Sequence, residues 1–318
     1  GDAYDIDAGR TGNALVVDAG VAVSVSTPWL TTNRTMIAGF AFKLSASGNA
    51  GYLGTLRQPD GDGTSVAYEN LDIRVTANLA LNLWVAGVTN NTTANNIVTT
   101  GNWYYLEIKA YCDNTSGTVE VRLDGTPVMT YTGDTQLGST TPNYFSSFAF
   151  RGGGVSQRIT FDDLYICDGS GSTNNDFLGD CRVQTIWPDG DASGNMTANS
   201  GSDEYAMVNS HTLNTSNYIK DTTTGNQCVF TYESLPITPN TVLGVMVTTE
   251  SMLSGNLMRG HRALSQNGAG TINATTQLFP TTAWAQHGST TEVFETDADG
   301  SAWTPNLIDT ARWGVRVV

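Results

Sequence analysis

Short stretches of alternating apolar and polar residues, separated by glycine-rich turns, recur along the chain and constrain its fold more than any other feature. One face of the stretch 36–44 carries only apolar side chains, those of Met36, Ala38, Phe40 and Phe42. This two-residue period is that of a half-buried β-strand. Long stretches with the 3.6-residue period of an amphipathic helix are absent from the sequence. The pattern therefore predicts an all-β protein.

The clearest hairpin signal lies at residues 118–133. Two alternating stretches flank Asp124 and Gly125 there, and an Asp-Gly pair supplies the two positive φ angles of a type I′ turn. The preceding stretch, 102–112, also predicts a strand. It places one set of residues on a common face, namely Tyr104, Leu106, Ile108, Ala110 and Cys112. Strands spaced by roughly ten residues and joined by tight turns predict a β-sandwich.

A run of Gly, Ser, Thr and Asn interrupts the strand pattern and suggests a division into two parts. We expect a sandwich over residues 1–168, a linker over 169–178 and a second, smaller β-rich module over 179–318. One short helix is expected near 305–311. Thr304 can cap its first turn, and proline suits the first helical position.

Two acidic residues, Asp162 and Asp163, stand just before this linker. Successive side chains of a regular strand point to opposite faces, so we expect these two carboxylates to diverge. One would then accept hydrogen bonds from turn amides, and the other would lie in solvent. Cys167 and Cys181 flank the linker; a disulfide between them and a pair of reduced thiols both remain open.

Composition restricts the classes of partner. The net charge is −15 and charged residues make up 14% of the chain. Because an acidic surface repels phosphate backbones, we expect no nucleic-acid partner. No apolar run reaches the length of a transmembrane helix, so we expect no membrane insertion. A surface poor in lysine and rich in threonine and asparagine is suited to burial in protein contacts.

Three motifs in order resemble the laminin-G and concanavalin A-like jelly-roll domains. They are the Asn102-Trp103 start of the stretch 102–112, the Asp-Gly hairpin and the stretch 159–166. The resemblance covers about residues 10–170 and implies a jelly-roll sandwich that can hold Ca²⁺ at one rim. Asp60 and Asp62 are the candidate ligands. A metal-free tight turn is the alternative, and no other cofactor is expected.

Two longer stretches, 161–180 and 291–318, resemble a recurrent type of bacteriophage virion protein. The resemblance implies a structural protein of the phage particle, on the head or the tail, that is made in the host cytoplasm. Its expected partners are other virion proteins and copies of itself, with a host-surface glycan as a further candidate.

A contact surface is expected in the second module, because adaptable methionine side chains suit such surfaces. It would comprise Met246, Met252, Leu253, Leu257, Met258, Arg259 and Arg262. The alternative is that these methionines fill the core of the module.

Catalytic patterns are weak. The stretch from Glu292 to Asp299 approaches the paired carboxylates of glycoside hydrolases but ends in an Asp-Gly turn. The three histidines, His211, His261 and His287, lack a GxSxG or HEXXH context. We therefore predict no catalytic residue and no enzymatic activity. A secreted, extracellular carbohydrate-binding module is the alternative function, and a polysaccharide hydrolase is the third.

Overall fold

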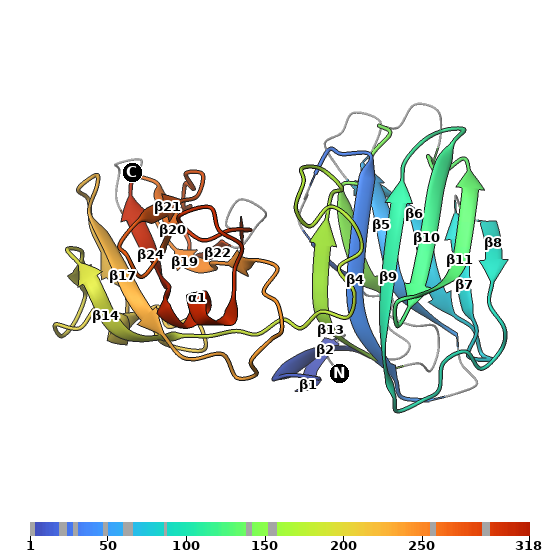
Figure 1. Cartoon of the computed structure of the whole chain (residues 1–318), viewed down its shortest axis with the longest axis horizontal. Coiled ribbons are helices and arrows are strands. Elements are labelled where there is room, and N and C mark those ends of the chain that lie inside the picture. The colour runs from blue at the N-terminus through green and yellow to red at the C-terminus, as the bar shows by residue number, and fades with distance from the viewer. Residues whose placement is uncertain are drawn as a thin grey trace. The chain divides into compact units, whose positions relative to one another are not determined.

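The computed structural model describes residues 4–18, 24–27, 31–46, 50–59, 66–85, 88–137, 142–151, 158–254, 259–287 and 293–318. The chain divides into two compact units, Gly1–Val183 and Gln184–Val318 (Figure 1), which we call the N-terminal and C-terminal units. Among the helices that the described ranges contain, none is long and apolar enough to cross a membrane.

The N-terminal unit is a jelly-roll β-sandwich of two antiparallel sheets (Figure 1). The seven-stranded sheet consists, in spatial order, of β1 (Tyr4–Ala8), β2 (Asn13–Val17), β13 (Ile159–Cys167), β4 (Thr35–Leu44), β9 (Trp103–Tyr111), β10 (Gly117–Leu123) and β11 (Thr126–Gly133). The six-stranded sheet consists of β3 (Ser24–Ser26), β12 (Ser147–Arg151), β5 (Gly51–Pro59), β6 (Val66–Val75), β7 (Leu81–Val85) and β8 (Val88–Thr92). The all-β jelly-roll prediction is confirmed.

Apolar faces of the two sheets meet in one core, as the alternating pattern predicts. The first sheet contributes Phe40 and Leu106, and the second contributes Leu53 and Leu83, all of them fully buried. Burial of this apolar area is the main stabilising contribution to such a sandwich. Strand β4 is buried on its outward face as well, at Ile37 and Ala41, so it is not the half-buried strand that the pattern predicts.

The hairpin between β10 and β11 has the predicted turn. Asp124 and Gly125 have φ angles of 48° and 76°, the left-handed values that a type I′ turn requires. The two strands pair from Gly117 opposite Gly133 to Leu123 opposite Thr126. The prediction for this hairpin is confirmed.

The C-terminal unit contains a five-stranded sheet and short two-stranded ribbons. In spatial order the sheet is β14 (Pro188–Gly194), β17 (Gln227–Tyr232), β24 (Arg312–Val317), β20 (His261–Gln266) and β21 (Ile272–Ala274). The ribbons are β15 (Thr197–Ala198) with β16 (Ile219–Lys220), β18 (Val245–Met246) with β23 (Val293–Phe294), and β19 (Thr249–Ser251) with β22 (Ala285–His287). A 3₁₀ turn, η1, spans Tyr205–Met207.

A small core holds the C-terminal unit together. Trp303 and Trp313 are almost fully buried in it, and the indole Nε1 of Trp303 donates a hydrogen bond to the Phe294 carbonyl at 2.8 Å. Strand β24 passes close to β17, where a Cβ built on Gly314 would lie 1.9 Å from the Cys228 carbonyl oxygen. Only glycine therefore fits at this central position of the sheet.

The short helix α1 (Pro305–Thr310) begins as predicted. Thr304 is its N-cap and accepts a hydrogen bond from the Leu307 amide at 3.2 Å, and proline occupies the first turn. The stretch 241–252 contains two short strands, β18 and β19, which pair with different partners. Its residues therefore form two ribbons instead of one continuous strand.

The break between the units falls after Val183, later than the linker that the composition suggested. Residues 176–183, which we call the strap, lie against the seven-stranded sheet. Lys109 of that sheet forms an ion pair with Asp176 at 3.0 Å, and Glu107 accepts a hydrogen bond from the Gly179 amide at 2.8 Å. These contacts assign the strap to the N-terminal unit.

Candidate functional site

A β-bulge in β13 brings Asp162 and Asp163 to the same arginine. Asp162 lies opposite Ala41 of β4, but the next paired residue is Tyr165, opposite Gly39. The extra residue in β13 interrupts the alternation, and Asp163 takes a left-handed φ of 54°. The expectation that the two acids diverge is therefore wrong.

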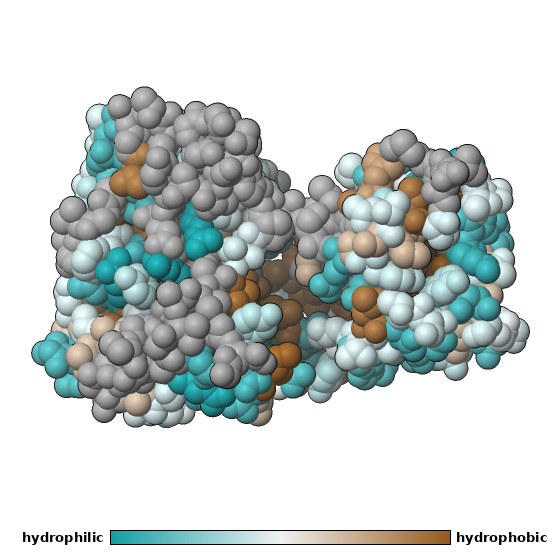
Figure 2. Space-filling view, turned by 180° about the vertical axis from the view of Figure 1, so that it is seen from behind, coloured by the Kyte–Doolittle hydropathy of each residue, from teal (hydrophilic) through white to brown (hydrophobic). Residues whose placement is uncertain are grey.

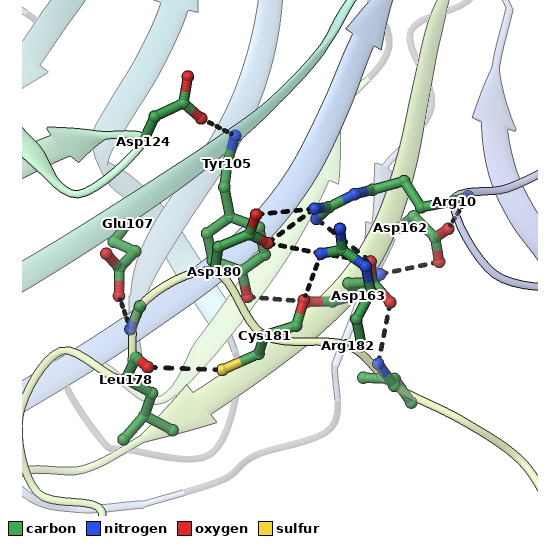
Figure 3. A network of polar contacts seen from close by, with 12 residues as sticks. Arg10, Tyr105, Glu107, Asp124, Asp162, Asp163, Leu178, Asp180, Cys181 and Arg182 are labelled. Carbon is green, nitrogen blue, oxygen red and sulfur yellow. Dashed lines mark hydrogen bonds and ion pairs between the residues drawn. The ribbon is translucent and has the colours of Figure 1, made fainter. Parts of the chain in front are cut away.

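Arg10 joins these acids to the strap (Figure 3). Its backbone amide donates to Asp162 Oδ2 at 2.6 Å, and its Nη1 lies 3.3 Å from Asp163 Oδ2. Its Nη2 donates to both carboxylate oxygens of Asp180, at 2.8 Å each. The Val183 amide also donates to Asp163 Oδ1 at 2.9 Å. One guanidinium thus fastens the β1–β2 turn, the bulge and the strap to one another.

A second set of contacts lies under the strap. The Tyr165 hydroxyl donates to Glu107 Oε1 at 2.6 Å and accepts from the Leu178 amide at 3.1 Å. The Tyr105 hydroxyl donates to the carbonyl of Asp163 at 3.0 Å. The buried side of the strap is therefore held by hydrogen bonds as well as by charge.

Burial raises the pKa of four groups in this network. Burial raises the pKa of Tyr105 and of Tyr165 well above the usual range of phenols, and for Tyr165 the hydrogen bond to Glu107 adds to the effect. Burial likewise raises the pKa of the Cys181 thiol to about 11. Burial is also the largest cause of the raised pKa of Asp163, and it outweighs the opposing effect of Arg10. We call this network under the strap the clamp and assign it a structural role. It consists of Arg10, Tyr105, Glu107, Asp162, Asp163, Tyr165 and Asp180.

The candidate binding site is a groove beside this clamp, on the outer face of the seven-stranded sheet. Antiparallel registry aligns two rows of side chains across β4, β9, β10 and β11. One row consists of Thr35, Tyr111, Thr118 and Thr132, and the other of Ile37, Lys109, Glu120 and Thr130. Except for Ile37, these residues line a groove of about 350 Å³, which the strap closes with Asp176 and Phe177.

The charges of the groove are held in fixed positions. Lys109 pairs with Asp176, and the guanidinium carbon of Arg122 lies 3.8 Å from the centroid of the Phe177 ring. Arg122 Nε also donates to Glu120 Oε1 at 2.7 Å. The groove thus presents both signs of charge, hydroxyl groups and aromatic rings, all on rigid strands or on the strap.

Acidification is expected to break the ion pair between Lys109 and Asp176. The hydrogen bond from Lys109 is the main cause that lowers the pKa of Asp176 below its usual value. The stabilising effect of this pair is therefore complete above about pH 3.9, the ordinary pKa of an aspartate, and is lost as the pH falls through the lower folded value. A carbon-detected NMR titration of the Asp176 carboxyl should show this low midpoint.

The Lys109→Met variant is the matched test of that titration. Without the ammonium, the midpoint of Asp176 should move up toward the ordinary value. Lys220→Met, a change of an exposed lysine in the C-terminal unit, should leave the midpoint where it is. An unchanged midpoint in Lys109→Met would show that the ion pair does not form in solution.

The sequence-based metal site lies outside the part of the chain that the structure describes. Asp60 and Asp62 both fall in the range 60–65, so the Ca²⁺ expectation stays a prediction. Within the described ranges, no group of three or more His, Cys, Asp or Glu residues is arranged to hold a metal ion. None of the four cysteines forms a disulfide in the structure, Cys167 and Cys181 included.

The residues considered for catalysis are dispersed. His211 stacks on Trp187 with ring centroids 4.6 Å apart, and His261 Nε2 lies 2.9 Å from the Thr249 hydroxyl. The His287 side chain and Glu292 are outside the described part of the structure.

Of the carboxylates in the stretch 292–299, Asp297 is buried. It accepts hydrogen bonds from the backbone amides of Asp299 and Ser301, at 3.0 and 2.8 Å. Glu295 and Asp299 are exposed. Asp297 thus stabilises a turn, which agrees with the Asp-Gly turn expected there.

The expected contact surface of the C-terminal unit is only partly described. Met246 is 56% exposed, while Met252, Leu253, Arg259 and Arg262 are half-buried. Leu257 and Met258 lie outside the described ranges. On the face shown in Figure 2, hydrophobic residues of this unit form small patches within a hydrophilic to neutral surface. The contact surface stays a prediction.

The groove and the clamp were not identified from the sequence. The alternating pattern does predict that three groove residues point outward from their strands, because they alternate with core residues. These are Lys109, Tyr111 and Arg122. The missing information was the order of the strands, which places β9 beside both β4 and β10. Contact between the strap and this face is a long-range feature, and no local pattern encodes it.

Comparison with known proteins gives similarity of fold only. No protein-family model matches the chain, and no curated protein matches it. Among solved structures, the chain is similar to alginate lyase Aly36B, with 9% identity, a TM-score of 0.37, and coverage of 48% of this chain and 80% of that chain. It is also similar to alginate lyase PA1167 from Pseudomonas aeruginosa, with 13% identity, a TM-score of 0.38, and coverage of 51% of this chain and 85% of that chain.

A third similar structure is the galectin LEC-6 from Caenorhabditis elegans, with 12% identity, a TM-score of 0.30, and coverage of 46% of this chain and 93% of that chain. These neighbours agree with the jelly-roll sandwich and show nothing of a virion protein. Two of the three are named as alginate lyases, so the prediction that the chain has no enzymatic activity is not upheld. The GxSxG and HEXXH motifs and the paired carboxylates are typical of hydrolases and metalloenzymes. Lyases cleave by elimination, and these motifs are not indicators of that reaction.

Proposed function

We propose that the N-terminal unit is a carbohydrate-binding jelly roll that holds its ligand in the groove between the seven-stranded sheet and the strap. The observation that carries this proposal is the composition of the groove on a rigid surface. Carbohydrates present hydroxyls that both donate and accept hydrogen bonds, together with apolar C–H faces. Four threonine hydroxyls, Lys109 and Glu120 match the former, and Tyr111 and Phe177 match the latter.

The size and rigidity of the groove support the same proposal. Its volume of about 350 Å³ falls in the range of small-molecule sites. The charged side chains are already paired with one another, and the strap is already docked. A ligand would therefore lose little free energy to ordering of the protein.

The test begins with a glycan array and continues with isothermal titration calorimetry of the full chain. For a bound glycan, Lys109→Met and Arg122→Gln are each expected to weaken binding by about tenfold, because a hydrogen bond to a charged group contributes about 1.5–3 kcal/mol. Lys220→Met is the matched control and should bind as the unaltered protein does. The same samples are assayed for cleavage of the bound polysaccharide.

Two results would contradict the proposal. One is an array on which no glycan binds above background. The other is a glycan whose affinity does not change in either groove variant while both variants remain folded by circular dichroism.

The virion structural role is the second candidate. Met246 is 56% exposed and is paired across β18 and β23 with Val293, which is 42% exposed. An apolar pair of this kind suits contact with another virion protein or with a second copy of the chain. Immunodetection of the protein in purified phage particles would support this role, and its absence from them would reject it.

A further inference from the structure

We propose that the outer face of the six-stranded sheet is a second binding surface, which takes an acidic polysaccharide through a row of alternating arginine and aromatic side chains. The row consists of Arg151, Tyr52, Arg74 and Trp84. These residues come from the four neighbouring strands β12, β5, β6 and β7. The proposal is independent of the groove, which lies on the other sheet.

The contacts within this row are close and continuous. The guanidinium carbons of Arg151 and Arg74 lie 4.3 and 4.4 Å from the centroid of the same Tyr52 ring. That of Arg74 also lies 3.6 Å from the centroid of the Trp84 ring. Each guanidinium is thereby held over an aromatic ring, which restricts its motion before a ligand arrives.

The charge of the row is layered, with the cations outermost. Asp72 accepts from the Thr55 hydroxyl and from Arg74 Nη2, at 2.6 Å each, and its other contact in the row is Arg151 Nη1 at 3.9 Å. Its side chain is only 7% exposed, whereas those of Arg74 and Arg151 are 22% and 24% exposed. An approaching ligand therefore meets guanidinium groups, and the carboxylate lies beneath them.

Two polar atoms next to each other in the sheet lack partners. Arg74 Nε and Asn82 Oδ1 are buried without a hydrogen-bond partner among the described residues, and their residues face each other across β6 and β7. Buried polar groups are normally paired, so such exceptions call for an explanation. Nε is a donor and Oδ1 is an acceptor, so ligand hydroxyls have the chemistry to pair with either atom when the side chains turn toward the ligand.

Neutral hydroxyls select the class of polyanion. With a net charge of −15, the protein as a whole repels a nucleic acid, which carries a phosphate at every residue of each strand, and it repels an acidic polysaccharide as well. The polysaccharide differs from a DNA strand because it carries several neutral hydroxyls beside each carboxylate or sulfate. It supplies an anion for the guanidinium groups and a hydroxyl for the unpartnered pair.

The experiment is calorimetric titration of the full chain with an oligogalacturonate, a malto-oligosaccharide as the neutral probe and a single-stranded DNA oligonucleotide. We expect the oligogalacturonate to bind in preference to the other two. Arg151→Gln and Arg74→Gln should each weaken its binding by about tenfold, because each removes a charge-assisted hydrogen bond. Arg151→Lys should restore part of the affinity, and Arg316→Gln in the C-terminal unit is the control.

Several outcomes would overturn this proposal. They are equal binding of the acidic and neutral probes, tighter binding of the oligonucleotide, and an unchanged affinity in both glutamine variants. A loss of oligogalacturonate binding in Lys109→Met, but not in Arg151→Gln, would place the acidic ligand in the groove instead. Circular dichroism of each variant separates loss of binding from loss of fold.

Discussion

Replacement of Asp163 by alanine is expected to lower the free energy of unfolding of the N-terminal unit by about 3 kcal/mol. The Val183 amide would lose its acceptor, and a buried unpaired donor is costly. Alanine would also have to adopt the left-handed φ of 54° that aspartate takes at this bulge. Differential scanning calorimetry of the full chain measures the shift of the transition that belongs to this unit.

Asp163→Asn is the control that separates shape from charge. Asparagine tolerates a left-handed φ and keeps an oxygen for Val183, so we expect a loss below about 1 kcal/mol at neutral pH. Burial raises the pKa of Asp163, so the folded protein binds this proton more tightly than the unfolded chain does. The stabilisation from protonation is complete below about pH 3.9 and is lost as the pH rises through the folded value.

The pH dependence of that comparison follows directly. The unaltered protein should gain stability relative to Asp163→Asn as the pH is lowered from neutral. If asparagine instead destabilises the unit as much as alanine does, the ion pair with Arg10 dominates, and the clamp depends on charge.

Replacement of Gly314 by alanine is expected to destabilise the C-terminal unit by more than about 3 kcal/mol. The added Cβ would lie 1.9 Å from the Cys228 carbonyl oxygen and 2.8 Å from the Val229 Cα. These are backbone atoms of the paired strand β17, so relief requires the two strands to separate. Because β24 also pairs with β20, separation would break the centre of the sheet. Calorimetry should show the transition of this unit lowered or absent.

Gly268→Ala is the matched control in the same unit. A Cβ at this position would have Thr310 Cβ as its nearest neighbour, at 3.9 Å, which is an ordinary contact. We expect a change within about 0.5 kcal/mol, or a slight gain from the less flexible unfolded chain. Equal effects of the two alanines would show that the approach of β24 to β17 is looser than the structure has it.

Local signals in the sequence were sufficient for the class of fold and for several elements. The hairpin at Asp124, the cap at Thr304 and the buried face of β4 each depend on residues within one turn or one strand of each other. Patterns of this range are readable from composition and period. The jelly-roll expectation, which is confirmed, came from the order of such elements.

The candidate site depends on contacts that no local pattern contains. Asp163 is buried because one extra residue in β13 changes the direction of its side chain, and the period of two assumes that no such residue exists. The run of Gly, Ser, Thr and Asn suggested a free linker, yet the residues that follow it are held by Glu107 and Lys109 from the centre of the sheet. The row around Tyr52 likewise required the strand order of the second sheet.

The ion pair between Arg10 and Asp180 also defines which segment of the chain can be exchanged between genes as one folded domain. Arg10 lies near the start of the N-terminal unit and Asp180 near its end, so this ion pair connects the two ends of the jelly roll. A recombination crossover within residues 169–178 would separate these partners, remove the strap from Glu107 and leave Arg10 with Asp163 as its remaining counterion. Exchange of this module between genes should therefore preserve the stretch through Val183, and the variable junction should begin at Gln184.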